Sequence, residues 1–346
     1  MAERPASRLW IWAAAAYAVL AIGLALWPFN FQPRCGDCPN GAEIAEGGLS
    51  FPSPGVVVDE TAGPRLHESL VGADGITIVV DASPGRFFQQ GPARIVSLSD
   101  GPGARNFTIG QERGSLIFRL RTPATGENGS KPATEAAWVM RPGLRRLFAA
   151  AYDGAAFRIH VDGALAGERR LAAGGFEDWG PDFTLIFGNE TNGDRPWIGR
   201  IHEVAVYDRA LPEAALAALK PGATPPLEGL VYRLSSRLAE DGALALPQTY
   251  VNDHDWRALR PGPRAPSDYA VNAAFLFPLG ALIALGCRGR TGLGALLAAA
   301  ALAAALEWGQ APLFSRTSAL ADLVAGWAGL GLGWLAVWGG ARLGLR

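Results

Sequence analysis

Charge is scarce in this sequence. Only 18% of its 346 residues are Asp, Glu, Lys or Arg, against about 25% in ordinary globular proteins. The formal net charge is −1, so the chain lacks the basic surface that attracts nucleic acids, and we expect no nucleic-acid partner. Lysine occurs only as Lys131 and Lys220, and a basic charge made almost wholly of arginine is typical of GC-rich bacterial genomes.

Cysteine is also scarce, and the three residues are too few for a four-ligand structural zinc site. Cys35 and Cys38 form a C-x-x-C pair, which would close a small disulfide in an oxidising compartment. Two other interpretations stay open: that the pair is unpaired, and that it is a redox or metal site. Redox pairs of this spacing usually begin a helix in an α/β fold, and the surrounding sequence shows no such pattern.

Hydrophobic residues are abundant, at 49% of the chain, and they concentrate in long runs. The run from Leu9 to Phe29 has no charged residue and is long enough to cross a bilayer. Its bulky end, Trp27 to Phe29, favours an uncleaved anchor over a signal peptide. Three further runs follow residue 266, so we expect transmembrane helices at 9–29, 268–287, 291–310 and 318–341.

Arginines flank these runs asymmetrically, which sets the expected orientation because cytoplasmic loops are enriched in Lys and Arg. Both termini and the loop between the second and third spans carry them, as Arg4, Arg8, Arg288, Arg290, Arg342 and Arg346. We therefore expect the tail 1–8 and the C-terminus in the cytoplasm. Residues 30–267 would lie on the periplasmic or extracellular side of a bacterial inner membrane, in a multi-pass protein.

The segment between the first and second spans is typical of an antiparallel β-sandwich. Short β-branched or alternating runs are separated by turn residues, without the strand–helix alternation of a parallel sheet. Asp153-Gly154 and Asp162-Gly163 predict tight hairpins, because a type I′ turn needs positive φ at both central residues. The expected strands are 76–81, 93–98, 106–111, 115–121, 146–152, 157–161, 164–170, 183–188 and 198–207.

Two stretches here resemble the laminin G or concanavalin A-like jelly roll. LFAAAYDGAAFRIHVDGALAGE (147–168) resembles the family's hairpin, and FTLIFGNETNGDRPWIGRIHEVAVYDRALPEAAL (183–216) its closing strands. The resemblance implies a sandwich over residues 42–220, with 221–267 as a connecting segment. Glucanases of this fold carry an E-x-D-x-E strand, which is absent here, and Glu177-Asp178 has the wrong spacing. We expect a binding or spacer module rather than an enzyme.

Candidate ligand-binding residues in the sandwich are aromatic or oxygen-bearing. Four aromatic side chains could stack on sugar rings or pack in the core, namely Trp138, Trp179, Trp197 and Tyr207. Four loop residues could hold Ca²⁺ with oxygen ligands or form Asx turns, namely Asp100, Asn106, Asn189 and Asp194. No other cofactor is expected.

Polar residues interrupt the C-terminal apolar runs, where they are costly and usually functional. At about 1.5 Å per helical residue they converge at the outer end of the spans, as Asn272, Glu307, Gln310, Arg316 and Asp322. They predict a pocket for the headgroup of a lipid or another amphiphile. The alternatives are a structural clamp, in which Arg316 pairs with Glu307 or Asp322, and interfacial residues without special partners.

The same residues resemble the VanZ-like family. The match rests on NAAFLFPLG (272–280), on Glu307, Gln310, Arg316 and Asp322, and on WPFNF (27–31). Ala325-Gly326 departs from the family, which often has Asn before this Gly. The resemblance implies a four-helix bundle into which the sandwich is inserted, and a link to glycopeptide antibiotic resistance.

The sequence therefore predicts a cell-envelope binding protein. The sandwich would bind a glycan or an envelope protein, and the helices would bind a membrane lipid. One alternative is a membrane enzyme that acts on a lipid-linked substrate with Glu307 or Asp322 as acid or base. The other is a structural or assembly protein without a small-molecule ligand.

Overall fold

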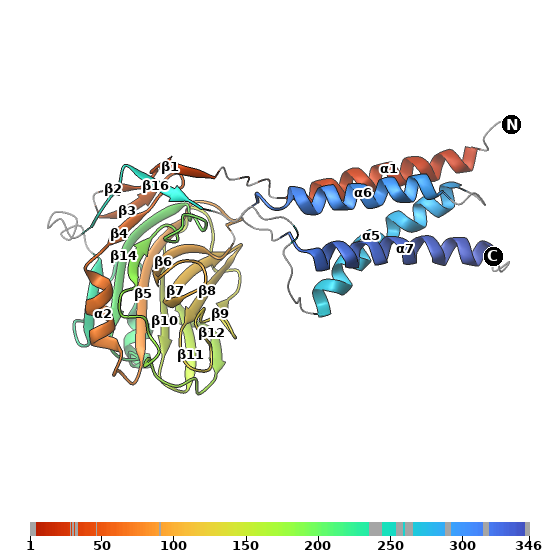
Figure 1. Cartoon of the computed structure of the whole chain (residues 1–346). Coiled ribbons are helices and arrows are strands. Elements are labelled where there is room, and N and C mark those ends of the chain that lie inside the picture. Colours follow the sequence, from red (N-terminus) through yellow and green to blue (C-terminus); the bar gives the residue numbers. More distant parts are fainter. Residues whose placement is uncertain are drawn as a thin grey trace. The chain divides into compact units, whose positions relative to one another are not determined.

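The computed structural model divides the chain into two compact units (Figure 1). The helical unit comprises Met1–Pro33 and Asp255–Arg346, and the sandwich comprises Arg34–His254. The structure describes residues 5–27, 29, 31, 34–45, 47–89, 91–234, 244–253, 259, 266–287, 292–313 and 318–342.

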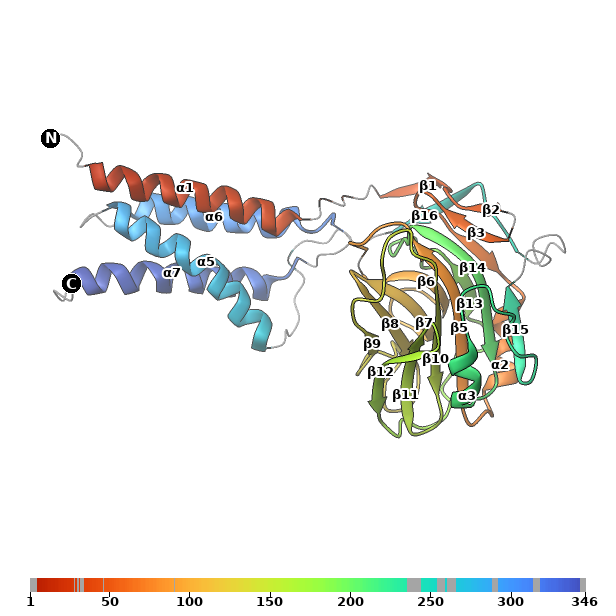
Figure 2. The same ribbon diagram turned by 180° about the vertical axis from the view of Figure 1, so that it is seen from behind.

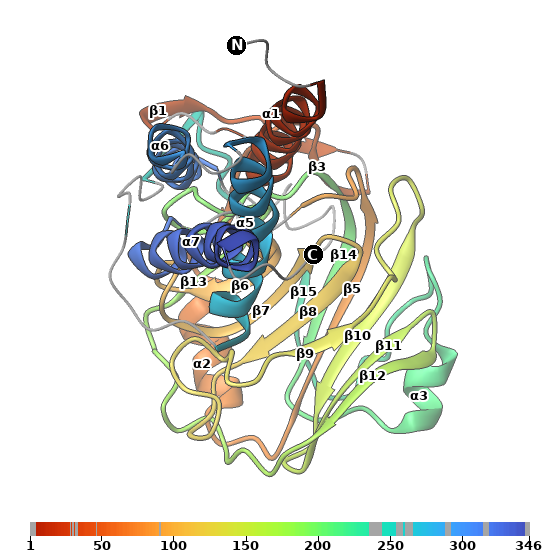
Figure 3. The ribbon, with the colours of Figure 1, turned by 90° about the vertical axis from the view of Figure 1, so that its right-hand side faces the viewer.

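Two antiparallel sheets form the sandwich. One has the strand order β12-β11-β10-β5-β14-β3-β2, with β15 also paired to β14, and the other has the order β4-β13-β6-β7-β8-β9. Figure 3 shows β5, β10, β11 and β12 following one another in one curved layer. A separate two-stranded sheet joins β1 to β16. The bounds are β1 Cys35–Pro39, β2 Glu43–Ala45, β3 Gly48–Phe51, β4 Val57–Asp59, β5 Ile76–Pro84, β6 Ala93–Ser99, β7 Arg105–Glu112, β8 Ser115–Leu120, β9 Thr134–Ala136, β10 Arg146–Tyr152, β11 Ala156–Val161, β12 Ala164–Arg170, β13 Thr184–Phe187, β14 Gly199–Tyr207, β15 Leu230–Leu234 and β16 Thr249–Asn252.

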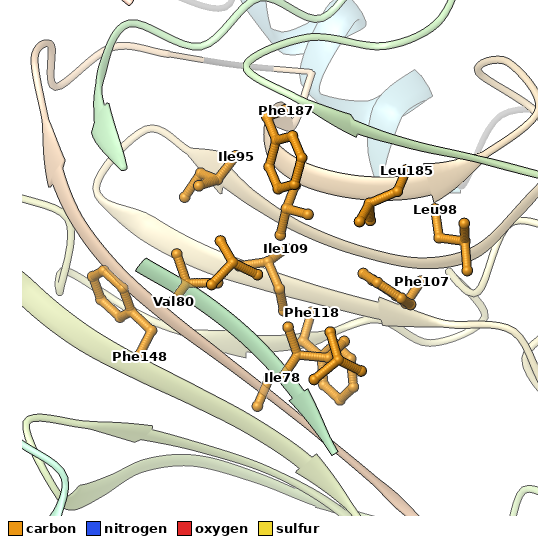
Figure 4. Packing of buried hydrophobic residues seen from close by; sticks show 14 of the residues in the cluster. Ile78, Val80, Ile95, Leu98, Phe107, Ile109, Phe118, Phe148, Leu185 and Phe187 are labelled. Atoms are coloured by element: carbon orange, nitrogen blue, oxygen red, sulfur yellow. The ribbon is translucent and has the colours of Figure 1, made fainter. Parts of the chain in front are cut away.

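The main core lies between the two sheets, because alternate residues of each strand point to the same face. Ile78 and Val80 of β5 come from one sheet, and Phe107 and Ile109 of β7 from the other (Figure 4). All four side chains are fully buried. Removing such apolar area from water is the dominant favourable term in folding, so this core fixes which residues remain outside it.

Two short helices pack on the sandwich. α3 (Glu213–Ala218) places Leu216 in a second apolar cluster with Val79 and Tyr207 of the larger sheet (Figure 2). α2 (Ala62–Leu70), which the sequence analysis does not anticipate, buries Leu66 and Leu70 in the main core. The helices therefore add apolar cover without interrupting either sheet.

The predicted strands agree closely with the observed ones, and β10 and β12 have the predicted bounds. Asp162 and Gly163 have φ values of 51° and 81°, as a type I′ turn requires. The first predicted hairpin has a different turn, because only Gly154 of the Asp153-Gly154 pair has positive φ. The Asp153 carboxylate instead accepts the N–H groups of Ala155 and Ala156, which stabilises a longer loop.

The sandwich extends beyond the predicted range of 42–220. Within the segment predicted as a connection, β15 pairs with β14 and β16 pairs with β1. The stretch before Leu230 is rich in Pro and Gly, which is typical of a linker. Only the pairing with β14, which is distant in sequence, shows that the next residues form a strand. Cys35 and Cys38, both in β1, are joined by a disulfide, and the neighbouring Arg34 forms an ion pair with Asp253.

The described part of the helical unit contains α1 (Pro5–Leu26), α5 (Pro266–Cys287), α6 (Leu293–Gly309) and α7 (Leu320–Arg342). Three of them, α1, α5 and α7, are long and apolar enough to cross a membrane, whereas α6 is a shorter apolar helix of 17 residues. These helices indicate that the chain associates with a membrane. A four-span bundle stays a prediction, because α6 lies at the lower limit of the length that a span needs.

Glycines bring α5 and α7 into close contact. A Cβ atom at Gly329 of α7 would lie 1.9 Å from the carbonyl oxygen of Ala273, and one at Gly280 of α5 would lie 1.9 Å from that of Leu330. Such distances are impossible for a side chain, so the backbones approach each other only because both residues lack one. Gly331, in the same helix, has nothing within 4 Å of this position.

Candidate functional site

Three aromatic side chains form an exposed cluster on the sandwich, here called the aromatic platform. Trp138 is 70% exposed and stacks on Phe87, with ring centroids 6.1 Å apart and planes 22° apart. Phe88 is 47% exposed and meets Phe87 edge-on, at 5.0 Å. The platform therefore joins the loop after β5 to the residues after β9.

A buried polar network holds the backbone beneath the platform. The Gln111 side-chain amide donates to the carbonyls of Arg86 (2.9 Å) and Arg113 (2.7 Å), which ties the loop after β5 to the β7–β8 turn. Its carbonyl oxygen accepts hydrogen bonds from Gln89 Nε2 and Trp197 Nε1, both at 2.9 Å. Because Gln89, Gln111 and Trp197 are buried, these hydrogen bonds anchor the loop that carries Phe87 and Phe88.

The β7–β8 turn fits closely under the rings. A Cβ atom at Gly114 would lie 2.9 Å from the Phe87 ring and 3.0 Å from the Trp138 ring. The Gly114 carbonyl accepts the N–H of Met140 at 2.8 Å, which fixes the segment after Trp138. Trp138 itself has a φ of 60°, an unfavourable conformation for a bulky residue that often marks a functional position.

The surroundings of the platform are basic. Arg86, Arg113 and Arg141 are exposed, and they lie in the segments that meet at the platform. In the segments 84–89, 112–115 and 137–144 the only acidic residue is Glu112. Glu112 accepts the Gly91 N–H at 2.8 Å, and burial raises the pKa of its carboxyl group. Glu135, three residues before Trp138, is also exposed, so the exposed charges next in sequence to the platform are three arginines and one glutamate.

A second set of charges is buried and structural. Glu190 is 1% exposed and accepts hydrogen bonds from Arg94 Nε (3.0 Å), Arg105 (3.5 Å) and the hydroxyl of Ser99. Burial lowers the pKa of Arg105 to about 9, which leaves it protonated at neutral pH. These side chains tie β6, β7 and the loop after β13 together, and their burial leaves no room for a ligand.

The other predicted aromatic residues are buried. Trp179 is 3% exposed and donates to the carbonyl of Arg121, and Trp197 is fully buried. Tyr207 is also fully buried and donates to the carbonyl of Pro226. None of these three rings offers a face to a glycan, so the interpretation as core packing fits them. Only Trp138 of the predicted set is available for stacking.

Three of the four predicted calcium ligands make side-chain contacts within the protein. Both polar atoms of the Asn106 side chain bond to the backbone of Gly180, and the Asn189 carbonyl oxygen accepts two backbone N–H groups. Asp194 pairs with Arg195 at 3.0 Å, and Asp100 is exposed in a turn. Across the described residues, no three His, Cys, Asp or Glu side chains group as a metal site. Side-chain bonds to the backbone of this kind also occur in structural turns, and a calcium site at these residues stays a prediction.

The polar residues of the helical unit come together at a cavity of about 310 Å³. Asn272, Glu307, Gln310 and Asp322 all line it. Glu307 is only 9% exposed, and its Oε1 accepts the N–H of Ala319 at 2.7 Å. Arg316, the fifth predicted member, lies outside the described residues.

A comparison with protein families identifies the sandwich. Residues 61–217 match the Laminin_G_3 model, described as the concanavalin A-like lectin/glucanases superfamily. This stretch is similar to that superfamily, and the sandwich that contains it, Arg34–His254, is called the lectin domain below. The match covers slightly less than half of the chain and does not reach α5, α6 or α7. No curated protein matches the chain.

Solved structures resemble the lectin domain at low identity. The CBM40 module of a Ruminococcus gnavus IT-sialidase, bound to α2,3-sialyllactose, is 15% identical, with 51% of this chain and 97% of that one covered and a TM-score of 0.42. A heptameric SAP-like pentraxin from Limulus polyphemus is 11% identical (62% and 94%, TM-score 0.35). A Bacteroides ovatus protein, described as a candidate carbohydrate-binding protein, is 15% identical (59% and 52%, TM-score 0.39). The chain thus spans about half the length of this last protein.

Of the platform residues, only Trp138 is among the binding residues predicted from the sequence. Phe87, Phe88 and the glutamines that hold them were not predicted. The signal was the adjacent pair Phe87-Phe88, directly after Gly85-Arg86 in a turn region. The pair follows the end of β5 at Pro84, so it lies in a loop, and loops run over the protein surface.

Proposed function

We propose that this protein is a membrane-anchored carbohydrate-binding protein. The observation that carries the proposal is the aromatic platform of Phe87, Phe88 and Trp138 on a concanavalin A-like lectin domain. Large apolar side chains that cluster at the surface, rather than lie singly, mark interaction sites. Flat aromatic rings match the apolar face of a sugar ring, whose hydroxyl groups remain in water.

The surrounding arginines favour an acidic glycan. Arg86, Arg113 and Arg141 are exposed beside the platform, and guanidinium groups bind carboxylate and sulfate oxygens with paired hydrogen bonds. We infer that the ligand carries such groups. Because exposed charges are screened by salt, its binding should weaken as ionic strength rises.

A glycan array probed with the full-length protein in detergent tests this proposal. We expect binding to one class of acidic glycan and a loss of at least about tenfold in affinity for Trp138→Ala, since buried Trp contacts dominate binding energy. Leu227→Ala is the matched control, because Leu227 is an equally exposed apolar side chain of the sandwich, at 73%. Equal binding by Trp138→Ala, or no binding by a folded lectin domain, would contradict the proposal.

Replacing Arg113 separates the contribution of charge from that of stacking. We expect Arg113→Gln to weaken binding of acidic glycans at low salt and to have little effect at 1 M salt, where about 3 Å of screening length remains. Binding of any neutral glycan should be unchanged. A loss that is the same at every salt concentration would contradict the electrostatic role.

The cellular setting is proposed from the arginine pattern. Residues 30–267 would lie on the outer side of a bacterial inner membrane, where envelope glycans are found. The family match ends at residue 217, so the VanZ-like character of the helices and a role in glycopeptide resistance stay predictions. The enzyme and structural alternatives also stay predictions, and the platform favours neither of them.

A further inference from the structure

A second binding site lies within the helical unit, separate from the lectin domain. Its cavity is lined near the end of α1 by Leu24, early in α5 by Asn272, at the end of α6 by Glu307 and at the start of α7 by Asp322. Asn272 is six residues from the first residue of α5, which is about 9 Å along a helix. All four helices therefore contribute to a cavity near one end of the unit.

Two side-chain amides in this cavity have no protein partner. Asn272 and Gln310 each carry a carbonyl oxygen and an NH₂ group, and neither group forms a hydrogen bond within the described part of the chain. Both side chains are half-buried, and polar groups without hydrogen bonds are costly within a membrane. The amides are therefore placed to bind something other than the protein.

Carboxylate side chains also line the same cavity. The Glu307 side chain is 9% exposed, and the N–H of Ala319 holds its Oε1 in place. Asp322 lines the cavity from the next helix. Together with the amides, these groups surround the volume with hydrogen-bonding atoms from three helices.

Apolar residues form the rim of the cavity. Leu24 is 50% exposed and Val271 is 66% exposed, and both line the cavity. In a membrane, such exposed apolar side chains face lipid tails, so the cavity reaches the lipid-facing surface of the unit. A molecule with an apolar tail can enter from the side while its headgroup moves inward.

We propose that the cavity binds the headgroup of an amphiphile that carries several hydroxyl groups, as a glycosyl or polyol lipid does. A hydroxyl group both donates and accepts hydrogen bonds, as do the amides of Asn272 and Gln310, whereas a choline headgroup has no donor. The volume of about 310 Å³ equals that of about ten water molecules at 30 Å³ each, which suits a headgroup but not a whole lipid.

Native mass spectrometry of the full chain in detergent tests this proposal, with monogalactosyl diacylglycerol as the probe. Phosphatidylcholine and phosphatidylethanolamine of matched chain length are the comparison lipids. We expect the galactolipid to bind at least about tenfold more tightly than either. The double variant Asn272→Leu/Gln310→Leu should lose about tenfold or more in galactolipid affinity, because each hydrogen bond contributes a few-fold.

Two further variants keep the test interpretable. Trp308→Leu is the matched control, because Trp308 follows Glu307 in α6 but is 67% exposed and does not line the cavity, and its affinity should match that of the unchanged protein. Ala303→Leu fills the cavity without removing a polar group, and it should also reduce binding. Equal binding of all three lipids, preference for a phospholipid, or unchanged binding in both cavity variants would overturn the proposal. Loss of glycan binding at the platform has no bearing on it.

Discussion

At the scale of single residues, Glu190 is a buried charge of the lectin domain that needs buried partners of opposite charge. It is the counter-charge of Arg94 and Arg105, and all three are at most 1% exposed. We expect Glu190→Gln to destabilise the domain by about 3–5 kcal/mol, because it leaves two buried guanidinium groups without a carboxylate. Urea unfolding of the full chain in detergent, followed by pulse proteolysis, measures this loss.

The matched control is an exposed ion pair. Glu228 is 87% exposed and pairs with Arg209 at 2.9 Å, where water screens the charges. Glu228→Gln should leave the urea midpoint unchanged. If Glu190→Gln behaves like Glu228→Gln, the buried network does not stabilise the fold in the way described.

Glu112 gives the lectin domain a pH dependence of defined sign. Burial raises the pKa of this carboxyl group in the folded state, so the folded chain holds the proton more tightly than the unfolded chain. Stability should therefore fall as pH rises from the unfolded to the folded pKa, and stay reduced above it. Glu112→Gln retains an acceptor for the Gly91 N–H and cannot ionise, so it should remove this loss. Urea midpoints measured from acidic to neutral pH would parallel those of the unchanged protein if the interpretation is wrong.

The sequence shows which side chains could bind a ligand more readily than it shows which of them are exposed. Trp138, Trp179, Trp197 and Tyr207 are equally plausible as sugar-stacking residues when only the sequence is known. One of these rings is exposed and three are buried. Which ring is exposed depends on the sheet face to which each residue points and on loops from distant parts of the sequence that cover it. The polar cavity could be predicted better, because helical spacing and membrane depth alone place Asn272, Glu307, Gln310 and Asp322 together.

At the scale of elements, the contact between α5 and α7 depends on which glycines face it. Gly329→Ala should destabilise the helical unit by about 1–3 kcal/mol, because its methyl group would overlap the carbonyl of Ala273. Gly331→Ala should instead be neutral or stabilising by up to about 1 kcal/mol, since it meets open space and alanine favours a helix. Size-exclusion chromatography after heating in detergent compares their melting temperatures. The same sign for both variants would contradict this crossing.

Local patterns predict strands well but predict their distant partners poorly. Alternation and turn residues placed the strands from β5 to β14 within a residue or a few at each end, except for the short β9, which was not predicted. β15 and β16 escaped prediction because their hydrogen bonds go to β14 and β1, which lie far away in the sequence. The apolar run predicted at 291–310 forms α6, Leu293–Gly309, which is near the lower limit of length for a span.

At the scale of the whole molecule, the lectin domain is an insertion whose two chain ends meet. Cys35 of β1 is the register partner of Asn252 of β16, and paired strands hold such Cα atoms about 5 Å apart. Replacing residues 35–252 with a short Gly-Ser linker should therefore leave the helical unit folded. We expect this variant to keep galactolipid binding and to lose glycan binding, as measured by native mass spectrometry and the glycan array. Aggregation of the shortened chain would show that the helices need the lectin domain.

The pairing of β1 with β16 also has a mechanical consequence. If the lectin domain binds a fixed polymer, a pulling force on it passes to the membrane through two chain segments. One segment precedes Arg34 and the other follows Asp253. Because these segments start side by side, in strands bonded to each other, the load divides between two covalent tethers. Neither strand can separate from the other without breaking the hydrogen bonds between them. The disulfide in β1 limits how far that strand extends under tension.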